Sequence, residues 1–149
     1  MAGWKPIIQF NLSQMNWKLI FQLSIFGLIM AFATISLIPE KIEFVFWLAI
    51  FIFCAYVIAR VCTGKYFLHG FCVSLVNCVW ITSAHIIFYS SYVAHHADMA
   101  NMGASMPLSS HPRLLMLIMG PLFGAGFGLV LGLFSFIASK IVSPKAAAQ

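Results

Sequence analysis

Charged residues are scarce in this sequence. Only 7% of its 149 residues are Asp, Glu, Lys or Arg, against about a quarter in soluble chains. Hydrophobic residues make up 62%, so a soluble fold of this size could not cover its apolar surface with so few charges. The composition therefore excludes an ordinary soluble domain and predicts that much of the apolar surface contacts the lipid bilayer. The net charge of +5 is not gathered into a basic patch, which argues against binding of nucleic acid.

The places where charge is missing predict the membrane spans. No charged residue lies between Lys18 and Glu40, Glu43 and Arg60, Lys65 and Asp98, or Arg113 and Lys140. A helix needs about 20 apolar residues to cross the hydrocarbon core of a bilayer, and these stretches lack the alternation of a membrane β-barrel. They predict an all-α, four-helix transmembrane bundle that forms a single integral-membrane domain. The expected spans are residues 17–37, 42–61, 66–94 and 114–141, and an outer loop covers about 95–112.

The basic residues predict the orientation of this bundle. With four spans, six of them fall on one side: Lys5, Lys18, Arg60, Lys65, Lys140 and Lys145. Lys41 and Arg113 fall on the other side, together with the three acids of the chain, Glu40, Glu43 and Asp98. Because Lys and Arg are retained in cytoplasmic loops, both termini are expected to be cytoplasmic. The small size and the charge asymmetry favour the inner (cytoplasmic) membrane of a bacterium.

Motifs of the common enzyme classes are missing. There is no G-x-S-x-G elbow, no phosphate-binding or dinucleotide-binding glycine loop and no H-E-x-x-H pair. The four cysteines include no C-x-x-C pair and none lies in an outer loop, so structural disulfides are not expected. The chain is accordingly expected not to be an enzyme.

Glycines recur at every fourth position of the last span, at Gly120, Gly124, Gly128 and Gly132. At 100° per residue they form a nearly straight ridge along one helix face. Small residues at this spacing let a second helix approach closely, which is how helices associate in lipid. The ridge predicts a packing surface, either for another helix of the same chain or for a partner helix.

Polar residues recur on the third span at steps of three or four. Because a polar stripe is costly in lipid, this track is expected to face the bundle interior. An intramembrane histidine such as His85 is a candidate proton relay or ligand of a haem or metal cofactor. A neutral His85 hydrogen-bonded to a neighbouring helix would explain it equally well, and the first span offers four candidate partners: Gln22, Ser24, Thr34 and Ser36. The track comprises Ser74, Asn77, Cys78, Thr82, His85, Tyr89, Tyr92 and His96.

The outer loop combines histidine, methionine and one aspartate within a short stretch. Imidazole with thioether suits copper, and imidazole with carboxylate suits zinc. The adjacent pair His95 and His96 diverges on a helix, which weakens a tetrahedral site. Methionines spaced as in this loop are also typical of a short helix lying on the membrane surface. The candidate metal ligands are His95, His96, Asp98, Met102 and His111.

These observations leave three functions open. The first is a structural or accessory subunit that packs with other membrane helices, as a homo-oligomer or within a membrane complex. The second is a membrane protein that binds or handles copper or zinc through the outer loop. The third is a small channel or carrier lined by the polar track.

Overall fold

The computed structural model describes residues 15–142, and their secondary structure is entirely helical. The long helices are α1 (Trp17–Ser36), α2 (Glu40–Val61), α3 (Tyr66–Ile87) and α6 (Pro112–Ile141). Each is long and apolar enough to cross a membrane, which confirms the predicted four-helix architecture. Two short helices, α4 (Tyr89–His95) and α5 (Ala97–Ala104), join α3 to α6.

The helix ends follow local chemistry. The Asn16 side chain accepts a hydrogen bond from the Leu19 backbone N–H at 3.0 Å, which caps α1. Pro39 begins α2, whose first turn contains Glu40 and Glu43 and whose last turn contains Arg60. This order of charges suits the helix dipole.

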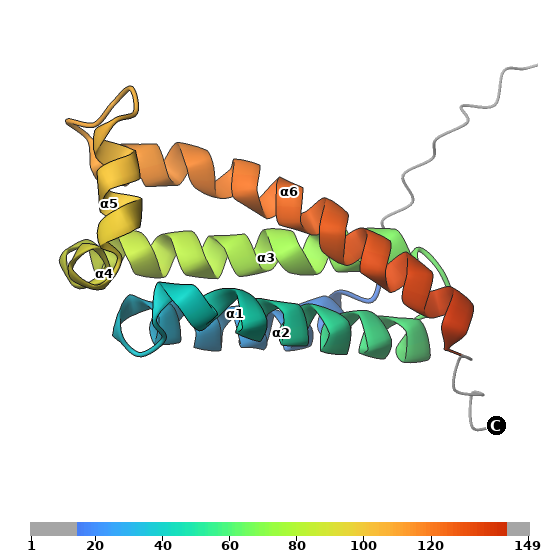
Figure 1. Ribbon diagram of the computed structural model, residues 1–149. Helices are drawn as coiled ribbons and strands as arrows, with labels where there is room; N and C mark the ends of the chain where they lie inside the picture. Colours follow the sequence, from blue (N-terminus) through green and yellow to red (C-terminus); the bar gives the residue numbers. More distant parts are fainter. Residues whose placement is uncertain (1–14, 143–149) are drawn as a thin grey trace, which may run out of the picture.

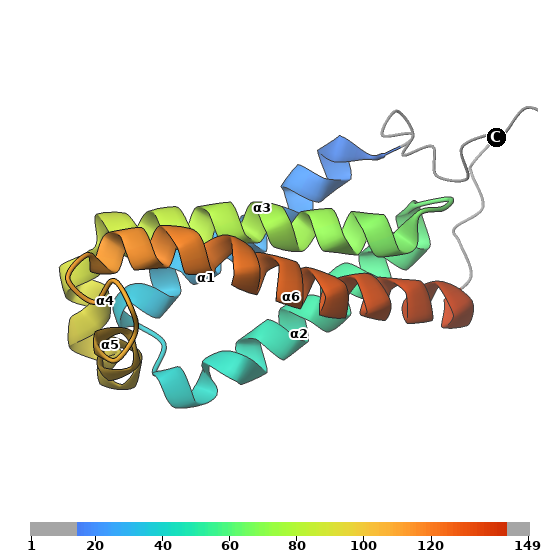
Figure 2. The same cartoon turned by 90° about the horizontal axis from the view of Figure 1, so that it is seen from above.

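The helices form two layers (Figure 1). In both views α3 and α6 are neighbours. In Figure 1 the pair of α1 and α2 lies below α3, and α6 approaches α2 toward the turn that joins α2 to α3 (Figures 1 and 2). One end of the bundle is covered by α4 and α5, and we call it the capped end. The other end contains the turn from Cys62 to Lys65 between α2 and α3, and we call it the turn end.

The apolar core lies closer to the turn end. Its fully buried members come from all four long helices and include Ile20, Ile58, Val73 and Leu131. A smaller cluster, Ala31, Ile35 and Ala84, lies toward the capped end and includes no residue of α2. In both views α2 and α6 diverge toward the capped end (Figures 1 and 2). The first turns of α2 therefore have less apolar packing to hold them than its last turns.

The third helix is shorter than the predicted span 66–94. It ends at Ile87, because the backbone of Phe88 (φ −98°, ψ 31°) leaves the helical region and starts the separate helix α4. The expected loop 95–112 is also partly helical, since it contains α5. Because the chain changes direction at Phe88, Tyr92 and His96 face back toward the bundle.

Candidate functional site

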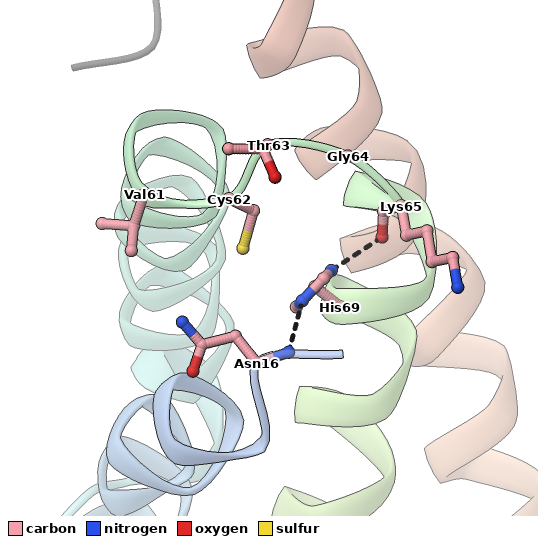
Figure 3. A pocket seen from close by; sticks show the side chains of 7 residues that line it. All are labelled: Asn16, Val61, Cys62, Thr63, Gly64, Lys65 and His69. Atoms are coloured by element: carbon pink, nitrogen blue, oxygen red, sulfur yellow. Dashed lines mark hydrogen bonds between the residues drawn. The ribbon is translucent and has the colours of Figure 1, made fainter. Parts of the chain in front are cut away.

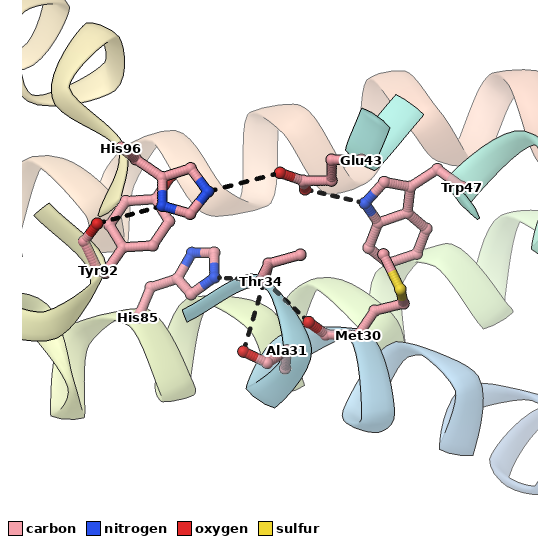
Figure 4. A network of polar contacts seen from close by, with 8 residues as sticks. All are labelled: Met30, Ala31, Thr34, Glu43, Trp47, His85, Tyr92 and His96. Carbon is pink, nitrogen blue, oxygen red and sulfur yellow. Dashed lines mark hydrogen bonds and ion pairs between the residues drawn. The ribbon is translucent and has the colours of Figure 1, made fainter. Parts of the chain in front are cut away.

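A stack of three rings forms the centre of the capped end (Figure 4). The Tyr92 ring of α4 lies between two imidazoles, with its centroid 4.0 Å from that of His85 and 4.4 Å from that of His96. The interplanar angles are 23° and 16°, so the rings are nearly parallel. The break at Phe88 makes this stack possible because it lets α4 turn against α3.

Thr34 of α1 sets the tautomer of His85. The Thr34 hydroxyl donates to the Met30 carbonyl oxygen at 2.8 Å, so its hydrogen is already used. The hydroxyl lies 3.1 Å from His85 Nε2 and must accept there, which places a hydrogen on Nε2. His85 thus makes the hydroxyl contact expected for a structural histidine, and this bond occupies the nitrogen that faces α1.

His96 faces two acceptors, and this is the decisive feature of the site. Its side chain is 1% exposed. Its Nδ1 lies 3.1 Å from the Tyr92 carbonyl oxygen, which can only accept, so Nδ1 carries a hydrogen. Its Nε2 lies 3.8 Å from Glu43 Oε2 and has no other partner. In a neutral His96 with an ionised Glu43, two lone-pair atoms would face each other in a buried place. An imidazole with a hydrogen on both nitrogens would present a donor to each acceptor.

Glu43 is held in place for this contact by its own helix. Trp47 lies one turn further along α2, and its indole N–H donates to Glu43 Oε1 at 3.0 Å. This leaves Oε2 to face His96 (Figure 4). The Glu43 side chain is 26% exposed, so the pair has access to solvent on the carboxylate side. The contact joins α2 to the end of α4, across the region where α2 leaves the bundle.

Tyr92 stays a neutral phenol between the two imidazoles. Burial raises its pKa to about 12, and the carboxylates of Glu43 and Glu40 add to this effect. The ring therefore contributes stacking and exclusion of water.

The candidate metal ligands of the outer loop do not come together. His95 is exposed and its Nδ1 bonds the Ser91 carbonyl oxygen, whereas His96 is turned inward. His111 Nδ1 lies 2.9 Å from the Ser110 hydroxyl, and Asp98 and Met102 are exposed. Within residues 15–142 no three His, Cys, Asp or Glu side chains form a group that could hold a metal ion.

The predicted polar track divides between two neighbours of α3. Ser74 donates to the Gly124 carbonyl oxygen of α6 at 3.2 Å, and Thr82 lies against Gly120 of the same helix. Asn77 lies against Gly27 of α1, on the side that also carries His85. At the capped end, Tyr89 lies beneath the guanidinium of Arg113 at 5.5 Å, and Tyr92 joins the stack. The track consequently lines two helix contacts, and no continuous polar pathway follows from it.

The glycine ridge of α6 lies against α3 of the same chain. A Cβ at Gly124 would meet Cys78, and one at Gly128 would meet Phe71. A Cβ at Gly132 would lie 2.9 Å from the Phe67 carbonyl oxygen, a backbone atom that cannot move aside easily. The ridge therefore serves internal packing, and a partner helix would have to use a different face.

A second buried histidine, His69, lies at the turn end and was not singled out by its sequence pattern. It is 2% exposed. Its Nδ1 lies 2.9 Å from the Lys65 carbonyl oxygen, and its Nε2 accepts from the Asn16 backbone N–H at 3.0 Å. Figure 3 shows both bonds beside a pocket of about 410 Å³. His69 thus joins the first turn of α3 to the start of α1. The sequence carries no signal for it, because the partner atoms are backbone atoms.

The Asn77 side chain is buried without polar partners in the described part of the chain. It is 3% exposed, and neither its amide nitrogen nor its amide oxygen has a hydrogen-bond partner. We expect Asn77→Ala to raise the free energy of unfolding in detergent by up to about 1–3 kcal/mol, the usual cost of a buried unsatisfied polar group. Gly27→Ala should lower it, and the double variant should recover. A loss of stability in Asn77→Ala would contradict this.

No protein-family model, curated protein sequence or solved structure gives a significant match to this chain. Its four apolar helices define an integral membrane protein. Any more specific role has to come from the geometry of its two histidine sites.

Proposed function

We propose that this chain is a proton-responsive membrane protein whose working site is the His96–Glu43 pair at the capped end. The observation that carries the proposal is the pair of acceptors that faces buried His96, because a doubly protonated imidazole would present a donor to each of them. A histidine is suited to this role because its charge changes between about pH 5 and 8.

We propose that the proton on His96 controls the position of the first turns of α2. With both nitrogens protonated, His96 pairs with the Glu43 carboxylate and ties the first turns of α2 to α4. When the proton leaves, Nε2 becomes an acceptor that faces a carboxylate, and the attraction is lost. Few apolar contacts hold this part of α2, so we propose that its first turns move away from α4 as the pH rises.

The orientation that we propose places the capped end outside the cytoplasm. Among the described residues, Lys18, Arg60, Lys65 and Lys140 lie at or near the turn end, which suits a cytoplasmic face. In a bacterial inner membrane the His96–Glu43 pair would then respond to protons of the external compartment.

Nitrogen NMR of histidine tests the proposal directly. In ¹⁵N-histidine-labelled protein we expect His96 to carry hydrogens on both nitrogens at mildly acidic pH and to lose one as pH rises. His85 should remain the Nε2–H tautomer while Thr34 is its partner. His96→Gln assigns the signal, and His95→Gln is the matched control, since His95 is the exposed neighbour. A neutral His96 over the whole range from about pH 5 to 8 would refute the proposal.

An accessory role is a second candidate, and the exposed face of α2 favours it. This face is rich in aromatic residues, and Phe44 at its capped end is 71% exposed. Since the glycine ridge is occupied by α3, a partner membrane helix would have to pack on another face, such as the exposed apolar residues of α2. Native mass spectrometry of gently extracted protein tests this role: co-extracted subunits or a second copy would support it, and a lone monomer would argue against it. The exposed face of α2 includes Phe44, Val45, Phe46, Ile52, Phe53 and Tyr56.

A further inference from the structure

His69 at the turn end has the opposite proton requirement from His96. Its Nδ1 faces a carbonyl oxygen and needs a hydrogen, whereas its Nε2 faces the Asn16 N–H and needs a lone pair. Only the neutral ring satisfies both partners. A proton added to Nε2 would point at the Asn16 N–H and break the link between α1 and α3.

Protons can reach His69 from the turn-end side of the membrane. The ring lines the pocket of about 410 Å³ together with Cys62, Thr63 and Gly64, and Figure 3 shows the Cys62 thiol and the Thr63 hydroxyl pointing toward it. Polar walls of this kind hold water readily. His69 is therefore buried in the protein but borders a polar opening at the end of the bundle.

The charges around His69 also oppose a second proton. Lys65 lines the same pocket, and burial raises the pKa of the Cys62 thiol to about 11, so it stays neutral. From α6, Ser135 contacts the neighbouring Gly70, and Lys140 lies over the Phe136 ring. The 149-residue sequence has three acidic residues, Glu40, Glu43 and Asp98, and all of them lie at the capped end. No acidic side chain could therefore pair with a charged His69.

His96, in contrast to His69, faces a carboxylate. The Glu43 carboxylate of α2 faces it directly, and the cations of this end within the described residues are Lys41 of α2 and Arg113 of α6, the latter over Tyr89. The titratable and charged groups at this end, within the described residues, are Glu40, Lys41, Glu43, His85, Tyr89, Tyr92, His95, His96, Asp98, His111 and Arg113.

We propose that His69 is a second proton-binding site of opposite sense, so that the described conformation is favoured by acid at the capped face and by neutral pH at the turn face. The first half of this statement rests on the proposed function of the His96–Glu43 pair, and the second half rests on His69 alone. Together they make the chain responsive to a proton gradient across the membrane.

Fluorine NMR of protein labelled with 5-fluorotryptophan tests both ends at once in nanodiscs. Trp17 follows Asn16 directly and reports the turn end, and Trp47 bonds Glu43 and reports the capped end. We expect the Trp17 resonance to change as pH falls and the Trp47 resonance to change as pH rises. Linkage to one proton allows the population of the opened state to change by up to about tenfold per pH unit.

Glutamine variants separate the two sites. In His69→Gln the amide can donate to the Lys65 carbonyl oxygen and accept from Asn16 without titrating, so the Trp17 response should vanish while the Trp47 response remains. His96→Gln should do the reverse, and His111→Gln, at an exposed site, should change neither.

The outcomes are distinguishable. A Trp17 resonance that is unaffected by acid, or one that responds equally in His69→Gln, would overturn the inference about His69 and leave the proposed function intact. A Trp47 resonance that does not change with pH, with Trp17 responding as expected, would overturn the proposed function and keep His69 as the single proton site.

Discussion

Gly70→Ala should destabilise the bundle more than any other single methyl added at a glycine of α3 or α6. The new Cβ would lie 2.6 Å from the Leu131 carbonyl oxygen and 2.5 Å from Ser135 Oγ. A side chain can rotate away, but the backbone of α6 cannot, so α3 and α6 must separate. Overpacking of this kind costs about 1–3 kcal/mol and sometimes more. The measurement is reversible unfolding in mixed detergent micelles, followed by circular dichroism.

Gly126→Ala is the matched control for this experiment. Gly126 has no atom within 4 Å of an added Cβ, and it lies on α6 between two glycines of the ridge. We expect this variant to be neutral or to gain up to about 1 kcal/mol, the difference in helix propensity between the two residues. Equal losses in Gly70→Ala and Gly126→Ala would show that flexibility matters here and that close packing does not.

The four spans could be predicted because lipid excludes charge whatever the packing is. Gaps between charged residues placed α1 at 17–37 and α2 at 42–61, within two residues of the observed bounds. The end of α3 could not be placed in this way. No glycine or proline marks the break at Phe88, and the ring contacts that accompany it, between Tyr92 and the imidazoles of His85 and His96, are not visible in the sequence.

The candidate site was only partly visible in the sequence. Helical spacing places His85, Tyr92 and His96 on one track, but it does not predict that their rings form a stack, because the stack depends on the change of direction at Phe88. Charge counting treats Glu43 as a marker of topology, whereas the structure makes it the partner of His96. Contacts between helices join residues that are far apart in the chain. The spacing of residues within one helix therefore does not reveal them. Trp47 lies four residues after Glu43 on the same helix, and this spacing lets the two side chains meet.

Glu43→Ala should release the first turns of α2 from the capped end. Within residues 15–142 the change removes the one carboxylate that contacts His96, and it takes away the group that faces Nε2 of the buried imidazole. Truncating one member of a buried charged pair costs about 2–5 kcal/mol, and the partial exposure of Glu43 places our expectation near the lower limit. The free energy of unfolding should fall accordingly at mildly acidic pH. Glu40→Ala, which removes the same charge from the same helix turn, should cost at most about 1 kcal/mol.

Glu43→Gln should reverse the sign of the capped-end pH response, and this outcome is specific to the proposed proton. The amide introduced at position 43 can still accept from Trp47, and its N–H can donate to a neutral His96. In the wild-type chain the link to His96 is present at lower pH and is lost as His96 gives up its proton. In the variant the link should form with neutral His96 and be lost on acidification. Distances between spin labels on α2 and α5, measured at several pH values, follow both chains. A variant with the wild-type direction of change would show that the Glu43 carboxylate and the His96 proton do not hold α2.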